Sequence, residues 1–243
     1  MKSTVFLTLL ILASCNAFSQ EDSKLIKVSE DIELIKISDN AFVHVTISTI
    51  PPYGKVSSNG LIFINKEEAF LFDTPVSDSL TSVLVSWLRS NLGLRIVGFV
   101  PNHWHEDCMG GLEYLKSQKV KSYANQMTID IARLKKLPVP EFGFRDSLKL
   151  QLGDKTIECF YLGGAHSTDN IVVWIPSERI LFAGCMIKSL VSTNLGNTAD
   201  GDLKAYPLTI DKLANKFPMA IYVIPGHGQY GGMNLVNHTK DLI

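Results

Sequence analysis

The sequence shows no excess of charge of either sign. Its 243 residues contain 23 Lys and Arg against 24 Asp and Glu, which gives a formal net charge of -1 at pH 7. A nearly neutral chain has no general electrostatic attraction to nucleic acid or to anionic lipid, so no nucleic-acid partner is expected. Hydrophobic residues make up 46% of the chain, enough to bury a full core in one large domain or in two tightly joined halves.

An apolar run long enough to span a bilayer is also absent, and no membrane span is expected. The run at residues 5–13 is too short, and because it follows a basic N-terminus it is typical of an export signal. We expect a signal peptide of residues 1–19, a single domain of residues 20–243 and a periplasmic protein. A second processing route competes, because the motif LASC resembles a lipoprotein box that would remove residues 1–14 and attach a lipid anchor to Cys15.

Cysteine is scarce. Of four cysteines, Cys108, Cys159 and Cys185 remain after removal of the signal, and an odd number excludes a framework in which every cysteine forms a disulfide. A thiol retained in an exported protein is easier to understand as a thiolate bound to a metal, although a buried inert cysteine is equally ordinary. Cys159 lies within a strand-like segment and fits the inert interpretation best.

A dense group of polar side chains follows the apolar run at residues 96–100. Residues 101–111 (PNHWHEDCMGG) contain two histidines, two carboxylates and a thiol. Alternate side chains of an extended segment point the same way, so we expect His103, His105 and Asp107 on one face. This arrangement predicts a metal site.

The periodicity of apolar residues predicts alternating strands and helices. Strand-like segments occur at residues 31–37, 41–47, 60–64, 69–72, 96–100, 120–123, 148–152, 156–161, 171–175, 179–182 and 221–224. Helical spacing occurs at residues 77–91, 112–116 and 125–134. A strand, a helix and a strand imply a parallel crossover. The second half repeats the rough order of the first, which suggests two similar halves facing each other.

Two features beside these strands each allow two interpretations. Residues 48–59 are rich in turn formers and are expected to form an irregular, mobile flap whose apolar tip covers a substrate; a long hairpin turn is the alternative. Asp73, at the end of a strand, is either a helix cap or a group that orients a metal ligand.

Three further polar clusters follow strand-like segments and contain His166, Cys185 and His227. Taken singly, each cluster has an ordinary structural explanation. A histidine beside glycines is more often a turn residue, and a cysteine that ends a strand is usually part of the core. Together with the first cluster they place N, O and S donors at four strand ends, which chance explains poorly. His44 and His238 lie outside every cluster and receive no site role.

The donors suit zinc. Three imidazoles form a site with an open fourth position, and an aspartate, a cysteine and a histidine form a second one. Two adjacent zinc ions can share a water, lower its pKa to about 7 or below and polarise a carbonyl. The inferred chemistry is hydrolysis.

The motif at residues 103–107, followed by His166, Cys185 and His227, resembles the metallo-β-lactamases, and the cysteine makes it similar to their B1 subclass. The resemblance covers about residues 30–243. It implies an α/β fold, an αββα sandwich in which two mixed β-sheets pack face to face with helices on the outer faces. It also implies two zinc ions, the first held by His103, His105 and His166 and the second by Asp107, Cys185 and His227.

The activity implied by the resemblance is hydrolysis of the β-lactam amide bond of penicillins, cephalosporins and carbapenems by a zinc-bound hydroxide, conferring antibiotic resistance. Asp107 and Asn197 would be the catalytic residues. Lys188 would bind the substrate carboxylate, and Asn197 would also orient or polarise the lactam carbonyl. The protein would act as a monomer on a small-molecule β-lactam.

Two other functions compete. Another hydrolase of the same fold, a thioesterase or a lactonase, is one of them. Thioesterases similar to glyoxalase II usually have a histidine after the motif aspartate and a bridging aspartate in place of Cys185, and both features are absent here. The other is a non-catalytic zinc-binding protein of the same fold, which the complete set of donor positions argues against.

Cys108 departs from the family, whose members often carry arginine immediately after the motif aspartate. It could be a small packing residue with no role in the metal site, an oxidisable group or an alternative ligand. Alternation of side chains predicts that Cys108, the neighbour of Asp107, faces away from the metals, which favours the role of a packing residue. Cys108→Ser is then expected to retain most zinc and activity, and loss of one zinc equivalent would identify Cys108 as a ligand.

Overall fold

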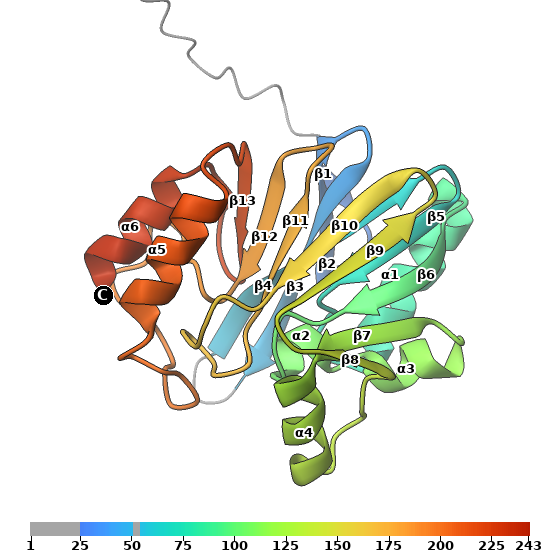
Figure 1. Ribbon diagram of the computed structural model, residues 1–243. Helices are drawn as coiled ribbons and strands as arrows, with labels where there is room; N and C mark the ends of the chain where they lie inside the picture. Colours follow the sequence, from blue (N-terminus) through green and yellow to red (C-terminus); the bar gives the residue numbers. More distant parts are fainter. Residues whose placement is uncertain (1–24, 51–53) are drawn as a thin grey trace, which may run out of the picture.

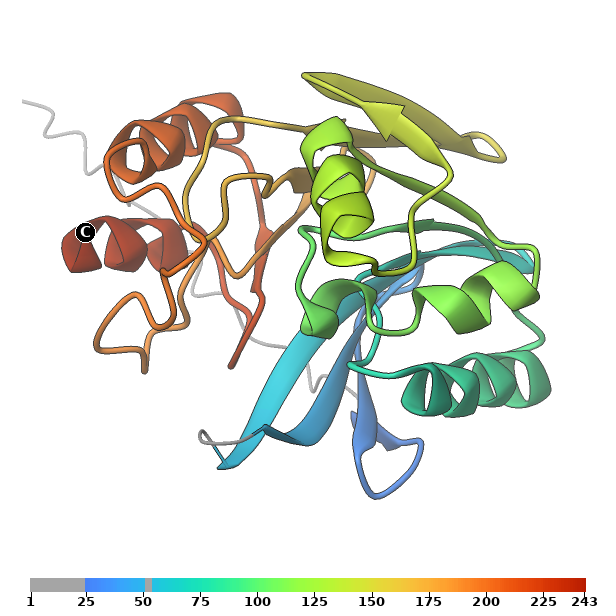
Figure 2. The ribbon, with the colours of Figure 1, turned by 90° about the horizontal axis from the view of Figure 1, so that it is seen from below.

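The computed structural model describes residues 25–50 and 54–243. Two β-sheets lie face to face, and helices cover their outer faces (Figure 1). Seen from below, α5 and α6 (orange to red) lie on one side of the molecule and α1 (teal) on the opposite side (Figure 2). No helix within the described ranges is long and apolar enough to cross a membrane. The expected signal peptide, with both processing sites, lies outside the described residues.

The first sheet has eight strands in chain order. They are β1 (Leu25–Lys27), β2 (Ile32–Ser38), β3 (Ala41–Ile50), β4 (Gly54–Asn65), β5 (Glu68–Phe72), β6 (Arg95–Val100), β7 (Lys121–Asn125) and β8 (Phe142–Phe144). Strands β1 to β5 pair antiparallel, whereas β5 to β8 pair parallel. The helices of this half are α1 (Asp78–Leu92), α2 (Glu106–Met109), α3 (Leu112–Ser117) and α4 (Gln126–Lys135).

The second sheet has five strands in the order β13-β12-β11-β10-β9. They are β9 (Ser147–Leu152), β10 (Lys155–Phe160), β11 (Val172–Ile175), β12 (Ile180–Gly184) and β13 (Tyr222–Pro225). Only the β12–β13 pair is parallel among the pairs described in this sheet. The helices α5 (Tyr206–Lys216) and α6 (Asn234–Leu242) complete this half. Each half thus contains antiparallel strands followed by a parallel crossover, as the sequence suggested.

Three layers of apolar side chains hold the sandwich together. Phe63 and Phe72 of the first sheet meet Phe182 of the second in the central layer. A second layer lies beneath α1 and α3, and a third lies beneath α5 and α6. Each fully buried side chain of this size contributes about 1.5–3 kcal/mol to folding. The layers fix the two sheets face to face and bring the ends of β6, β12 and β13 to one edge.

Helix α1 begins and ends where the sequence predicts. The Ser77 hydroxyl accepts a hydrogen bond from the backbone of Leu80 at 3.3 Å, and Gly93 ends the helix with φ 66°. Leu84 and Leu88 are fully buried on its inner face. Because Ser77 is the cap, Asp73 is not, and the interpretation of Asp73 as a helix cap is wrong.

The expected irregular flap at residues 48–59 is wrong for the part that the structure describes. Strands β3 and β4 pair in register from Ala41 with Phe63 to Ile50 with Gly54. Backbone N–H and C=O groups pair across a hairpin whatever the side chains are, so polar residues did not prevent the strands from continuing. The alternative, a long hairpin, agrees with this pairing, and the tip at residues 51–53 lies outside the described residues.

His44 is buried beside Asp73 at the end of β5. Its Nε2–H donates to the Asp73 carbonyl at 3.1 Å, and burial lowers the pKa of His44 from 6.5 to about 4. Below pH 6.5 the unfolded chain therefore takes up a proton here that the folded chain excludes until pH 4. The free energy of unfolding is expected to fall as pH drops through this window, with His44 accounting for about 3 kcal/mol.

Urea unfolding at several pH values between 7 and 4 would measure this loss. His44→Gln retains an N–H donor but cannot be protonated, so its stability should depend less steeply on pH. If the free energy of unfolding changes equally steeply with pH in both proteins, His44 is not the group responsible for the loss.

Candidate metal centre

An extended segment was expected after β6 from the sequence. The structure shows that only part of this segment is extended. Strand β6 ends at Val100, His105 has φ -67° and ψ 160°, and α2 begins at Glu106. Asp107 lies in the first turn of this helix. Successive side chains of a helix are about 100° apart, not on opposite faces, so Asp107 and Cys108 both reach the same site. The expectation that Cys108 faces away is wrong.

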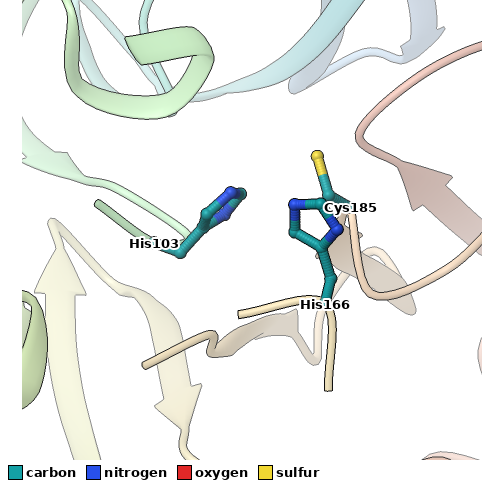
Figure 3. A group of neighbouring side chains, drawn as sticks. All are labelled: His103, His166 and Cys185. Carbon is teal, nitrogen blue, oxygen red and sulfur yellow. The ribbon is translucent and has the colours of Figure 1, made fainter. Parts of the chain in front are cut away.

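His103, His105 and His166 form one group of donors. Nε2 of His103 lies 2.9 Å from Nδ1 of His105, and the His166 ring centroid lies 5.0 Å from that of His103 and 5.4 Å from that of His105. Figure 3 shows His103 and His166 reaching from opposite sides toward one space. Burial lowers the pKa of both His103 and His166, which keeps their rings neutral as metal binding requires.

Asp107, Cys185 and His227 form a second group. Nε2 of His227 lies 3.3 Å from Oδ2 of Asp107 and 3.4 Å from the Cys185 sulfur, which is 3.7 Å from the same oxygen. A hydrogen bond from the Cys108 thiol and the charge of His227 hold the pKa of Cys185 well below its usual value. The Cys185 thiolate in turn raises the pKa of His227 well above its usual value. A thiolate is the form in which cysteine binds metals.

These donors fit a metal centre. The two groups are adjacent, since one ligand atom each of His103, His166 and Cys185 also lies within 4.8 Å of the others. Nδ1 of His166 is buried with no hydrogen-bond partner among the described residues, and a buried polar atom without a partner is costly unless something else binds the ring. Imidazole, thiolate and carboxylate are the donors that zinc takes in proteins.

Comparison of the sequence with those of known proteins identifies the family. A metallo-β-lactamase type 2 of Bacteroides fragilis is 49% identical over 240 residues, covering 99% of this chain and 95% of the relative. The chain belongs to the metallo-β-lactamase family. A metallo-β-lactamase type 2 of Pseudomonas aeruginosa is 33% identical over 209 residues, covering 86% of this chain and 83% of the relative. No family model matches the chain.

Comparison with solved structures leads to the same family. The metallo-β-lactamase from Pontibacter korlensis superposes with a TM-score of 0.83 at 37% identity, covering 87% of this chain and 98% of that one. The DIM-1 metallo-β-lactamase superposes with a TM-score of 0.80 at 37% identity, covering 90% and 98%. The resemblance to the B1 subclass and the predicted αββα sandwich are confirmed. Membership of this family implies a metal cofactor.

Asp73 and Asn102 hold His103 in place. Oδ1 of Asp73 accepts the backbone N–H of Asn102 at 2.5 Å, and Oδ1 of Asn102 lies 3.1 Å from Nδ1 of His103. With Nδ1 donating to Asn102, Nε2 of His103 is left for a metal. The Asn102 side chain also donates to the carbonyl of Ile171, just before β11. This part of the first sheet is thereby joined to the second, and the orienting role that the sequence allowed for Asp73 agrees with these contacts.

Asn59 fixes the loop that carries His227, and sequence reasoning missed it. Its side-chain nitrogen donates to the carbonyls of Pro225 at 2.9 Å and Gly228 at 2.7 Å, and its backbone N–H donates to Gly226 at 2.8 Å. His227 donates through Nδ1 to the carbonyl of Ser57 at 2.7 Å, so Nε2 faces Asp107 and Cys185. A buried asparagine within a strand gave no sequence signal of this contact.

Asp200, which contacts a histidine of the first group, was also missed by sequence reasoning. Its Oδ2 lies 3.1 Å from Nε2 of His105, although the two residues are 95 positions apart. If Nε2–H donates to this carboxylate, Nδ1 of His105 remains for a metal, and the carboxylate makes that nitrogen more basic.

Asp200→Ala is expected to lower metal affinity by about 10- to 100-fold, because a carboxylate that orients a histidine ligand typically contributes this much. Competition with a chromophoric chelator would measure the change. Asp211→Ala, which breaks an exposed pair between α5 and Lys240, is the matched control and should bind metal as the unsubstituted protein does. If the two variants bind alike, Asp200 does not support His105.

Lys188 lies beside Cys185 of the second group, and Asn197 lies in the loop that follows it in sequence. Lys188 is only 8% exposed, and its ammonium donates to the carbonyl of Cys185 at 2.8 Å. Burial lowers the pKa of Lys188. Its nitrogen lies 4.0 Å from the position that a Cβ on Gly196 would occupy, next to Asn197 in sequence. Asn197 is exposed, and its side-chain oxygen accepts the backbone N–H of Ala199 at 3.1 Å.

Proposed function

We infer that this protein is a zinc-dependent hydrolase that opens the β-lactam ring. The observation that carries this conclusion is the pair of adjacent donor groups, one of three histidines and one containing Cys185, in a chain of the metallo-β-lactamase family. The proposal extends to penicillins, cephalosporins and carbapenems as substrates, and to antibiotic resistance as the outcome.

The proposed centre holds two zinc ions. His103, His105 and His166 would bind the first, and Asp107, Cys185 and His227 the second. When bound, zinc would lower the pKa of a water molecule and polarise the amide carbonyl. The chain itself orients two of these rings, because hydrogen bonds from His103 and His227 to the protein leave one nitrogen of each ring facing the centre.

Lys188 and Asn197 would position the substrate. A β-lactam antibiotic carries a carboxylate, and the buried ammonium of Lys188 beside Cys185 offers it a charged hydrogen bond. The side-chain oxygen of Asn197 already accepts a backbone N–H, so the amide nitrogen is free to donate to the lactam carbonyl and stabilise the negative charge that develops there. Asp107 and Asn197 are the proposed catalytic residues.

Purified, zinc-loaded protein assayed with one penicillin, one cephalosporin and one carbapenem tests the proposal. Turnover of all three is the expected result. Turnover of none would support the non-catalytic alternative, and turnover of thioesters or lactones alone would support a different hydrolase of the same fold. Cys185 already argues against the thioesterase, in which a bridging aspartate stands at this position.

Export to the periplasm as a monomer, after cleavage of residues 1–19, completes the proposal. Mass spectrometry of the mature protein should find Gln20 at its N-terminus. An acylated Cys15 would instead identify a membrane-anchored lipoprotein.

A further inference from the structure

Cys108 is a buried thiol inside the metal centre that neither proposed zinc site uses. It is 1% exposed, and its sulfur lies 3.2 Å from Nδ1 of His103 and 3.9 Å from Oδ1 of Asp107. The carbonyl of Cys108 accepts the backbone N–H of Thr74 at 2.9 Å. The backbone contact and the helix geometry hold the side chain toward His103 and Asp107.

The two sulfurs of the centre flank one carboxylate. The Cys185 sulfur lies 3.7 Å from Oδ2 of Asp107, whereas the Cys108 sulfur lies 3.9 Å from Oδ1 of the same carboxylate. Two donor groups therefore overlap at Asp107. One contains Cys108 with His103 and the other contains Cys185 with His227, and within each group the ligand atoms lie within 4.8 Å of one another.

Because the two groups overlap, a cation bound beside Asp107 could take sulfur ligands from either group. Thiolates bind soft cations more strongly than imidazole or carboxylate does, and a cation that prefers sulfur gains most where two sulfurs are within reach. The centre is accessible from the side of the second group, since the side chains of Asp107 and His227 are 16% and 41% exposed. Cys108 and Cys185 are both buried.

We propose that Cys108 and Cys185 form a two-sulfur seat beside Asp107 that binds a soft d10 cation such as cadmium through both thiolates. The Cys108 S–H bond loses its proton to solvent, Cys185 is already held as a thiolate, and two metal–sulfur bonds form with no change of oxidation state. The seat shares the centre of the proposed function but requires no turnover. It would give this chain a soft-metal site that a residue without sulfur at position 108 could not provide.

Titration of the metal-free full-length protein with cadmium tests the proposal through the ultraviolet absorbance of cadmium–thiolate bonds. The absorbance per bound ion should be about twofold higher in the unsubstituted protein than in Cys108→Ser, because one of the two thiolates is removed. Cys185→Ser should show a similar loss. Cys159→Ala is the matched control, since Cys159 lies in the core between the sheets, and its absorbance should be unchanged.

Equal absorbance in Cys108→Ser and the unsubstituted protein would overturn the proposal and make Cys108 a packing residue. Circular dichroism shows whether each variant folds. If Cys108→Ser does not fold, cadmium NMR of the unsubstituted protein decides: a shift typical of two sulfur ligands supports the seat, and a shift typical of one sulfur overturns it. Neither result depends on hydrolysis by the zinc-loaded protein, so the two proposals can fail separately.

Discussion

Removing the metal from the purified protein with a chelator is expected to abolish β-lactam hydrolysis, and adding zinc should restore it. A metal that activates water and polarises a carbonyl lowers the barrier by several kcal/mol, and each 1.36 kcal/mol is tenfold in rate, so the loss should be about 1000-fold or more. Chromogenic cephalosporin hydrolysis before and after dialysis against the chelator, with metal content measured in parallel, would show it.

A serine mechanism would give a different result. Ser167 is next to His166, but its hydroxyl is buried and donates to Asp169, so it is not free to attack a substrate. Turnover that survives complete loss of metal would exclude the zinc mechanism and return attention to this hydroxyl. Restoration by zinc alone, with no recovery in metal-free buffer, rules out damage by the chelator as the cause.

Replacing Asp73 with alanine is expected to destabilise the fold and the metal centre together. The substitution leaves the buried N–H of Asn102 without its acceptor, which costs about 1–3 kcal/mol. It also removes the support beneath His103, for which a loss of about 10- to 100-fold in metal affinity is typical. Asp73 has φ 57°, a conformation that aspartate and asparagine tolerate better than alanine, so backbone strain adds to the loss.

Asp73→Asn is the matched control, because asparagine retains both the oxygen acceptor and the tolerance of this backbone conformation. Burial raises the pKa of the Asp73 carboxyl well above its usual value, which reduces the difference in charge between the two side chains. Urea unfolding and metal competition should therefore show a large loss for Asp73→Ala and a small one for Asp73→Asn. Equal losses would mean that charge, and not the acceptor, matters here.

The sequence by itself determined most of the elements and the donor set. Alternation predicted the hairpin of β2 and β3, and helical spacing with Ser77 and Gly93 predicted α1, because these signals are local. The six proposed zinc ligands were identified for a related reason. Five of them lie just after a strand or in a loop that follows one, Asp107 lies in the short helix that follows β6, and strand ends can be located from periodicity alone.

Only the tertiary structure decided how these residues meet. A helix of four residues, α2, is too short to leave a periodic signal, and its presence turned Cys108 toward the metals instead of away from them. Asp200 reaches His105 and Asn59 reaches the His227 loop only when the two sheets pack face to face. Such contacts depend on chain segments brought together by burial of the three apolar layers, and no local pattern of residues specifies them.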